Sequence, residues 1–522
     1  MVMQAPLDNA EAYVKALSEL DPVLGDLDGR NLNEGAAANV VRRVAHALSA
    51  HDGLHGTSAK VVSNALRNGL NLSPKHVAQV LRDGLNLDAV EVARALYDDI
   101  GWDWTPAEVA HTLRDGLNLD AMEVARALDK GLYLDWYDIA RALHAEDGLD
   151  LPPAQVAHTL RDGLSLPPAR IAQVLYSLSG LVLDEGPVAQ SLRDGLHLTA
   201  MEVAQALNEG LDFDWYDIAR TLYAEDGLNL PPARIARALY DGLHLTAVEV
   251  AQAFYDKGGL DLPPATVANA LRDALDLSNA HVAHALYNDD LEASDIANAL
   301  RSGLHLDAAD VAQALDEGLH FDWCDIAWVL HDGLNLDAVD VAQALNEGLH
   351  LDWCDIAWVL HAEDGLDLPP AQVACILRDG LSLPPARIAR ALYAEDGLNL
   401  PPARIARALC YGLHLTAVEV AQAFYDKGGL DLGLKATANV LTFDDGLDLS
   451  VTDVFRVLCG EHGLGLKAPA VAQTFQDMDL DAADDVIAAL QDFLTLSDDD
   501  VADTRRVLTD RAEQEDEDAL SL

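Results

Sequence analysis

The sequence predicts an all-α protein, specifically an α-solenoid in which one short helix-and-turn unit is repeated along nearly the whole chain. A Val/Ile-Ala-x-x-Leu pattern recurs every 15 to 17 residues, giving roughly 28 units. A Gly-Leu-x-Leu segment follows most copies of the pattern. Half of the residues are apolar, but each unit is too short to form a stable helix in isolation. Stacking of neighbouring units into one continuous core is therefore expected.

Each unit carries residues typical of a helix start. Thr199 with Glu202, and Asp88 with Glu91, have the spacing of a capping box, in which each side chain accepts a backbone N–H of the other residue. Units that begin Pro-Pro place the second proline at the first helical position, where the missing N–H costs nothing. These residues predict that every unit begins with its own capped helix.

The end and the buried face of each helix are also predicted. Glycines such as Gly195 are expected to end the helix, which gives it about nine or ten residues before the turn. Counted from the cap, positions 1, 4, 5 and 8 share one face of a helix. Alanine, Val or Ile, and Leu dominate these positions, so we expect them to form the core.

The repeat pattern predicts three regions. Residues 56–495 form the helical repeat solenoid. Residues 1–55 match the pattern poorly and are expected to form an N-terminal helical cap. Residues 496–522 are expected to form a C-terminal capping helix followed by an acidic tail.

The balance of charge is extreme: 87 acidic residues against 34 Lys and Arg give a formal net charge of −53. Such a surface repels nucleic-acid backbones and anionic membranes. A cytoplasm rich in salt, which screens charge over a few ångströms, and a basic binding partner would each account for it. We favour the saline cytoplasm, because the acids are spread through every repeat.

Other features of the composition point to a cytoplasmic protein. The five cysteines form no Cys-x-x-Cys pair and are odd in number, which is typical of a reducing compartment. The first residues lack the basic and apolar regions of a signal peptide. No stretch approaches the ~18 consecutive apolar residues of a membrane-spanning helix, so no membrane association is expected.

Position 6 of each helix forms the most informative row, because it lies opposite the expected core and contains no acid. Such a row can be a solvated face, can hydrogen-bond to adjacent helices, or can bind a protein or peptide. Its Arg, His, Asn and Gln side chains are also those that read nucleic-acid bases. The candidate binding residues in the row are Arg94, Arg126, Arg141, Arg220, Arg237, Arg390, Arg407, His111, His158 and His284.

Trp328 and Trp358 interrupt this polar row. Both end the sequence Asp-Trp-Cys-Asp-Ile-Ala-Trp, in which the first tryptophan is expected to pack between units. Exposed indoles are frequent anchors at protein interfaces. We therefore expect Trp328 and Trp358 to contact a partner.

The sequence lacks the Gly-x-Ser-x-Gly, phosphate-loop and zinc-binding patterns, so we expect no enzyme activity, no metal and no cofactor. The leading hypothesis is a non-enzymatic scaffold that binds a protein or peptide along an extended surface. Self-association into a filament or shell is one alternative. A nucleic-acid-binding array that reads bases through the position-6 row is another, although the charge disfavours it.

Overall fold

A computed structural model describes residues 34–50, 58–97, 104–288, 291–443, 445–460, 462–478 and 501–507, with residues 12, 14–16, 19 and 499. Throughout these residues the chain forms helices joined by turns, and no strand occurs among them. The repeated helices pack on their neighbours along the chain, as in an α-solenoid. The predicted fold class is confirmed.

The chain folds as two units, 1–262 with 273–275, and 263–272 with 276–522. The helices of the first unit are α3 (Glu34–Ala50), α5 (Ala59–Asn64) with its continuation η1 (Ala65–Gly69), α6 (Pro74–Leu85), α7 (Ala89–Leu96), α8 (Pro106–Leu117), α9 (Ala121–Leu132), α10 (Trp136–His144), α11 (Pro153–Leu164), α12 (Pro168–Tyr176), α13 (Glu185–Leu196), α14 (Ala200–Leu211), α15 (Trp215–Tyr223), α16 (Pro232–Leu243) and α17 (Ala247–Tyr255).

Helix α18 (Pro264–Leu275) contains the boundary between the units. The helices of the second unit are α19 (Asn279–Leu286), α20 (Ala293–Leu304), α21 (Ala308–Leu319), α22 (Trp323–Trp328) with η2 (Val329–Gly333), α23 (Ala338–Gly348), α24 (Trp353–His361), α25 (Pro370–Leu381), α26 (Pro385–Tyr393), α27 (Pro402–Arg407) with η3 (Ala408–Gly412), α28 (Ala417–Tyr425), α29 (Leu434–Thr442), α30 (Val451–Cys459) and α31 (Ala468–Asp477).

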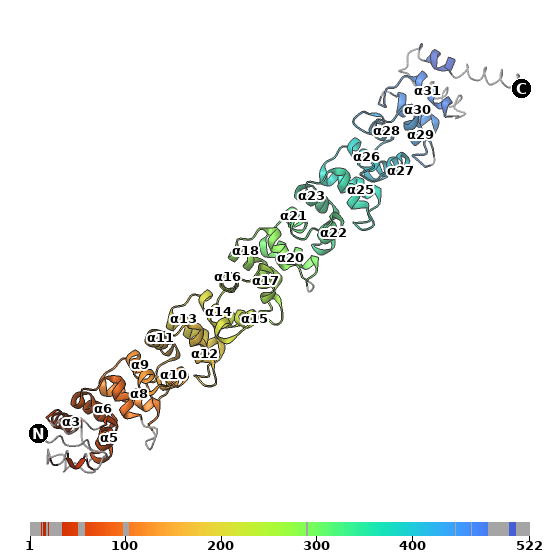
Figure 1. The fold of residues 1–522 in the computed structure, drawn as a ribbon. Helices are drawn as coiled ribbons and strands as arrows, with labels where there is room; N and C mark the ends of the chain where they lie inside the picture. Colours follow the sequence, from red (N-terminus) through yellow and green to blue (C-terminus); the bar gives the residue numbers. More distant parts are fainter. Residues whose placement is uncertain are drawn as a thin grey trace. The chain divides into compact units, whose positions relative to one another are not determined.

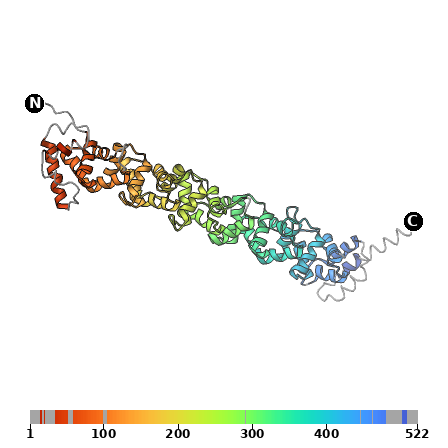
Figure 2. The same ribbon diagram turned by 90° about the horizontal axis from the view of Figure 1, so that it is seen from below.

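Within each unit, most helices pack against the next helix and against the helix after that. In the first unit α7, α9, α11 and α13 contact one another in succession, and so do α6, α8 and α10. In the second unit α21, α23 and α25 do the same. The helices of each unit follow one another in chain order in both views (Figures 1 and 2). The helices of each unit therefore form two layers, and each layer is a stack of every second helix.

The buried face of each helix is wider than predicted. In α9, Val124, Ala125, Ala127 and Leu128 are buried, which are positions 4, 5, 7 and 8, whereas Ala121 at position 1 is half-buried. The expectation of a core at positions 1, 4, 5 and 8 is therefore wrong in two respects. Position 1 is only half-buried, and position 7, which was not expected in the core, is buried. Each helix has neighbours within its own layer and in the other layer, so position 7 is covered as well.

The helices do not end where the sequence analysis placed them. The 15-residue units form helices of 12 residues, such as α9, and the 17-residue units form helices of nine residues, such as α10. Gly131 lies inside α9, and the left-handed residue that ends this helix is Tyr133, with φ 56°. The same third residue of Gly-Leu-x-Leu has φ near +55° along the chain, as at Asn118, Asp150 and His197. The expectation that glycine ends the helix is wrong.

The repeated glycines are instead required by close packing. A Cβ on Gly195 of α13 would lie 2.1 Å from the carbonyl oxygen of Ala154 in α11. In the 17-residue units the glycine follows the helix, and a Cβ on Gly148 would lie 2.0 Å from the carbonyl oxygen of Ala142. The glycine therefore provides space for a neighbouring backbone, while the next turn residue takes the left-handed conformation.

The predicted helix starts are confirmed. The Thr199 hydroxyl accepts the N–H of Glu202 at 3.3 Å, and the Glu202 carboxylate accepts the N–H of Thr199 at 2.8 Å. Asp88 and Glu91 form the same capping box. In α11 the second proline of Pro152-Pro153 is the first helical residue.

The terminal regions are described only in part. Of the predicted cap 1–55, the structure describes α3 and a few single residues; of the predicted tail 496–522, it describes Asp499 and the helical residues 501–507. The rest of both predictions lies outside the described residues. Within the described ranges no helix is both long enough and apolar enough to cross a membrane.

Candidate functional site

Many side chains at position 6 reach the C-terminal end of the second helix further along the chain, or the turn that follows that helix. The Gln205 side-chain amide of α14 donates to the carbonyl of Gly242 in α16 at 3.0 Å. Arg126 of α9 donates to the carbonyls of Gly163 and Asp162 in α11 at 3.0 and 3.1 Å. Equivalent bonds join Arg94 to Gly131, His111 to Gly148, Gln190 to Gly227, Arg220 to Gly258, Arg237 to Ala274, Asn298 to Gly333, Gln343 to Gly380, Cys375 to Gly412 and Arg407 to Gly446.

This geometry explains why the row contains no acid. The last carbonyls of a helix have no partner within that helix, and they form the negative end of its dipole. A donor or a cation stabilises them, whereas a carboxylate would face oxygen atoms. Of the roles left open for the row, hydrogen bonding between adjacent helices is therefore the one that these residues perform.

A second row of donors was missed by the sequence analysis. Arg114, at position 9 of α8, donates to the carbonyl of Leu149 at 2.9 Å, beside the contact of His111 with Gly148. Positions 6 and 9 are three residues apart and so share a helix face. The recurring Leu-Arg-Asp-Gly sequence was the available signal. Similar bonds join Arg82 to Leu117, Arg161 to Leu196, Arg193 to Leu228, Arg272 to Leu304, Arg301 to Leu334 and Arg378 to Leu413.

The remaining candidates of the row have other surroundings. Arg141 pairs with Asp138 within α10. His158 lies 3.4 Å from the Asp162 carboxylate. The Arg390 guanidinium lies 5.7 Å from the centre of the Trp353 ring, and His284 is exposed on α19. The predicted binding residues are thus distributed over helices from α7 to α27 and not gathered in one place.

Trp328 and Trp358 depart from the row. They are 50% and 43% exposed, on α22 and α24, which contact each other within one layer. Neither indole takes part in a hydrogen bond with any of the described residues. Because they occupy the same repeat position on stacked helices, the two indoles lie on one face of the second unit.

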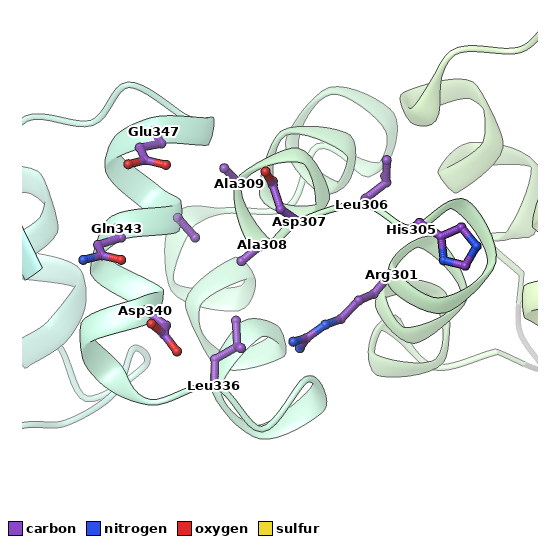
Figure 3. Close-up of a pocket in the computed structure, with 11 residues that line it drawn as sticks. Arg301, His305, Leu306, Asp307, Ala308, Ala309, Leu336, Asp340, Gln343 and Glu347 are labelled. Carbon is purple, nitrogen blue, oxygen red and sulfur yellow. The ribbon is translucent and has the colours of Figure 1, made fainter.

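A cavity of about 490 Å³ lies beside the row in the second unit (Figure 3). The end of α20 supplies Arg301 and His305, the start of α21 supplies Asp307, and Asp340, Gln343 and Glu347 follow one another along α23. Cavities of about 690 and 200 Å³ occur at equivalent places in the first unit and include Arg94 and Arg220. The helix stacking thus forms similar small grooves at several places along the surface.

Three of the five cysteines are poorly placed for nucleophilic catalysis. Burial raises the pKa of Cys324 to about 12, that of Cys354 to about 11 and that of Cys459 to about 12. Such thiols stay protonated at neutral pH, whereas catalysis needs the thiolate. In the described ranges no three His, Cys, Asp or Glu side chains are grouped as metal ligands would be.

No family model matches the sequence, and no curated protein matches it significantly.

Proposed function

We propose that this protein is a non-enzymatic, cytoplasmic helical-repeat scaffold that binds a protein or peptide partner along its surface. One observation carries the proposal. Trp328 and Trp358 are half-exposed at a repeat position where many other side chains bond to a neighbouring helix. Large aromatic side chains that a partner can bury contribute strongly to binding, so these two are the best candidates for its anchors.

The surroundings of the two indoles support this proposal. Trp328 and Trp358 occupy equivalent positions on α22 and α24, so a single partner segment can reach both. Repeated grooves of a few hundred Å³ beside the row accommodate single side chains of an extended segment.

The proposal is tested by selecting binders from a random peptide display library against the full chain. We expect peptides with a common motif to be enriched on the wild-type protein and not on the Trp328→Ala/Trp358→Ala variant. Tyr223→Ala with Tyr240→Ala is the matched control, since each tyrosine is 40% exposed on other helices. This control should enrich the wild-type motif. Absence of any enriched motif, or the same motif on the tryptophan variant, would overturn the proposal.

A further inference from the structure

Both exposed tryptophans lie in the longest stretch of the sequence that contains no Lys or Arg. Residues 302–377 hold 15 Asp and Glu against none of the two basic residue types. Every one of these carboxylates is exposed or half-buried, so the negative charge is at the surface. The general acidity of the chain is compensated in part by arginines elsewhere, but in this stretch it is not.

Four units share the sequence Asp-Trp-x-Asp-Ile-Ala, and two of them lack a cation that the other two contain. In α10 and α15 the position-6 side chain is an arginine that pairs with the position-3 aspartate, as Arg141 does with Asp138. In α22 and α24 that arginine is replaced by Trp328 and Trp358. Among the described residues no basic side chain pairs with Asp325 or Asp355.

The unpaired carboxylates lie close to further negative charge. Burial, followed by the charges of Asp322 and Asp364, raises the pKa of Asp325 above its ordinary value. Burial and the charge of Asp352 likewise raise the pKa of Asp355. In α22 and in α24, an aspartate without a cationic partner therefore lies three residues before an exposed indole on the same helix face.

This arrangement fits a cation from outside the chain. A guanidinium or ammonium group is attracted to the face of an indole and pairs with a carboxylate. An incoming arginine would occupy the place that Arg141 and Arg220 hold in the sister units. Stacked helices are about 8–10 Å apart, and a chain in the extended polyproline II conformation advances about 3.1 Å per residue and presents every third side chain on the same face. Basic residues three apart in the partner would therefore reach both indoles.

We propose that the surface formed by Asp325, Trp328, Asp355 and Trp358 binds a basic, extended peptide segment with an Arg-x-x-Arg spacing. One arginine stacks on each indole and pairs with the aspartate of the same helix. This inference rests on the proposed scaffold function and specifies the chemistry of its partner.

The test measures binding of a fluorescent Arg-x-x-Arg peptide to the full chain by anisotropy at 150 mM KCl. We expect saturable binding that weakens at least tenfold in Trp328→Ala/Trp358→Ala and in Asp325→Asn/Asp355→Asn. Asp138→Asn/Asp217→Asn is the matched control, because it removes the same charge at the same repeat position. It should bind as the wild type does, and a Glu-x-x-Glu peptide should not bind.

Other outcomes contradict the inference. Equal binding to all variants would mean that the peptide responds only to the net charge of the chain, and no binding would exclude a basic partner at this surface. The display selection separates this result from failure of the scaffold proposal. An acidic or apolar motif that depends on the two tryptophans would leave the scaffold function standing and overturn the basic partner.

Discussion

At the scale of single residues, the turn residue with positive φ has the clearest conformational requirement. Asparagine, aspartate and histidine enter the left-handed region more readily than other non-glycine residues, and they occupy most of these positions. Val182 is an exception with φ 56°. A β-branched side chain is strained there, and it is 57% exposed, so its packing recovers little of that cost.

Replacing Val182 by Asn should therefore stabilise the first unit by about 1 kcal/mol. The measurement is the midpoint of thermal unfolding, which should rise. The reciprocal change Asn229→Val, at the same position of a similar 17-residue unit with φ 50°, should lower it. If Val182→Asn leaves the midpoint unchanged or reduces it, the turn is not strained as inferred.

The sequence located this turn but not its left-handed residue. Gly-Leu-x-Leu follows both the 12-residue and the nine-residue helices, so the pattern alone does not show where a helix ends. The role of Gly195 depends on the backbone of α11, some 40 residues earlier in the chain. A contact of that kind becomes visible only when the stacking of alternate helices is known.

At the scale of helices, the donor rows join many helices to the second helix further along the chain. The bonds recur in both layers of the array, from Arg82 to Arg407. A helix of nine to 12 residues leaves four terminal carbonyls without an intrahelical partner, against roughly five to eight internal bonds, so capping by its neighbour matters. We infer that the acid-free row is maintained for folding at many of its positions.

The change Gln205→Glu replaces a donor by a carboxylate of the same shape facing the Gly242 carbonyl. This change should lower the free energy of unfolding by about 1–2 kcal/mol at neutral pH. The cost should diminish as the pH falls below about 4, where the new side chain is protonated and can donate again. Thermal unfolding at both pH values measures it.

Gln422→Glu provides the matched control. Gln422 follows nearly the same local sequence, Thr-Ala-x-Glu-Val-Ala, and is exposed on α28. This change should have little effect at either pH. Equal losses at the two positions would contradict capping between helices.

The sequence revealed the absence of acids at position 6 but not its cause. The partners of the row lie 35 to 39 residues away and belong to the backbone, which has no sequence signature. The arginines at position 9 looked like ordinary surface residues for the same reason. The capping boxes were predictable because both of their members lie within one turn of a helix.

At the scale of the whole molecule, the fold class was predictable because one unit is repeated so many times. The predicted exposure of Trp328 and Trp358 is confirmed as well. The two sister repeats carry arginine at this position, and the functional meaning of that difference was not predictable from the sequence. The structure explains its importance, because Arg141 and Arg220 pair with aspartates of their own helices and the tryptophans leave the equivalent aspartates without a cation among the described residues.

The net charge of −53 makes the stability of the array sensitive to salt. Repulsion between carboxylates opposes folding, and the Debye length falls from about 30 Å at 0.01 M to about 3 Å at 1 M salt. Helical circular dichroism should therefore strengthen as KCl rises from millimolar to molar concentrations. Full helicity at a few millimolar salt would contradict this expectation.

The central claim is that partner binding takes place on α22 and α24. Hydrogen exchange of the full chain, measured with and without the Arg-x-x-Arg peptide, tests it most directly. We predict slower amide exchange in residues 322–334 and 352–366 and unchanged exchange in the sister units at α10 and α15. Protection spread along the whole array, or located on other helices, would contradict the claim.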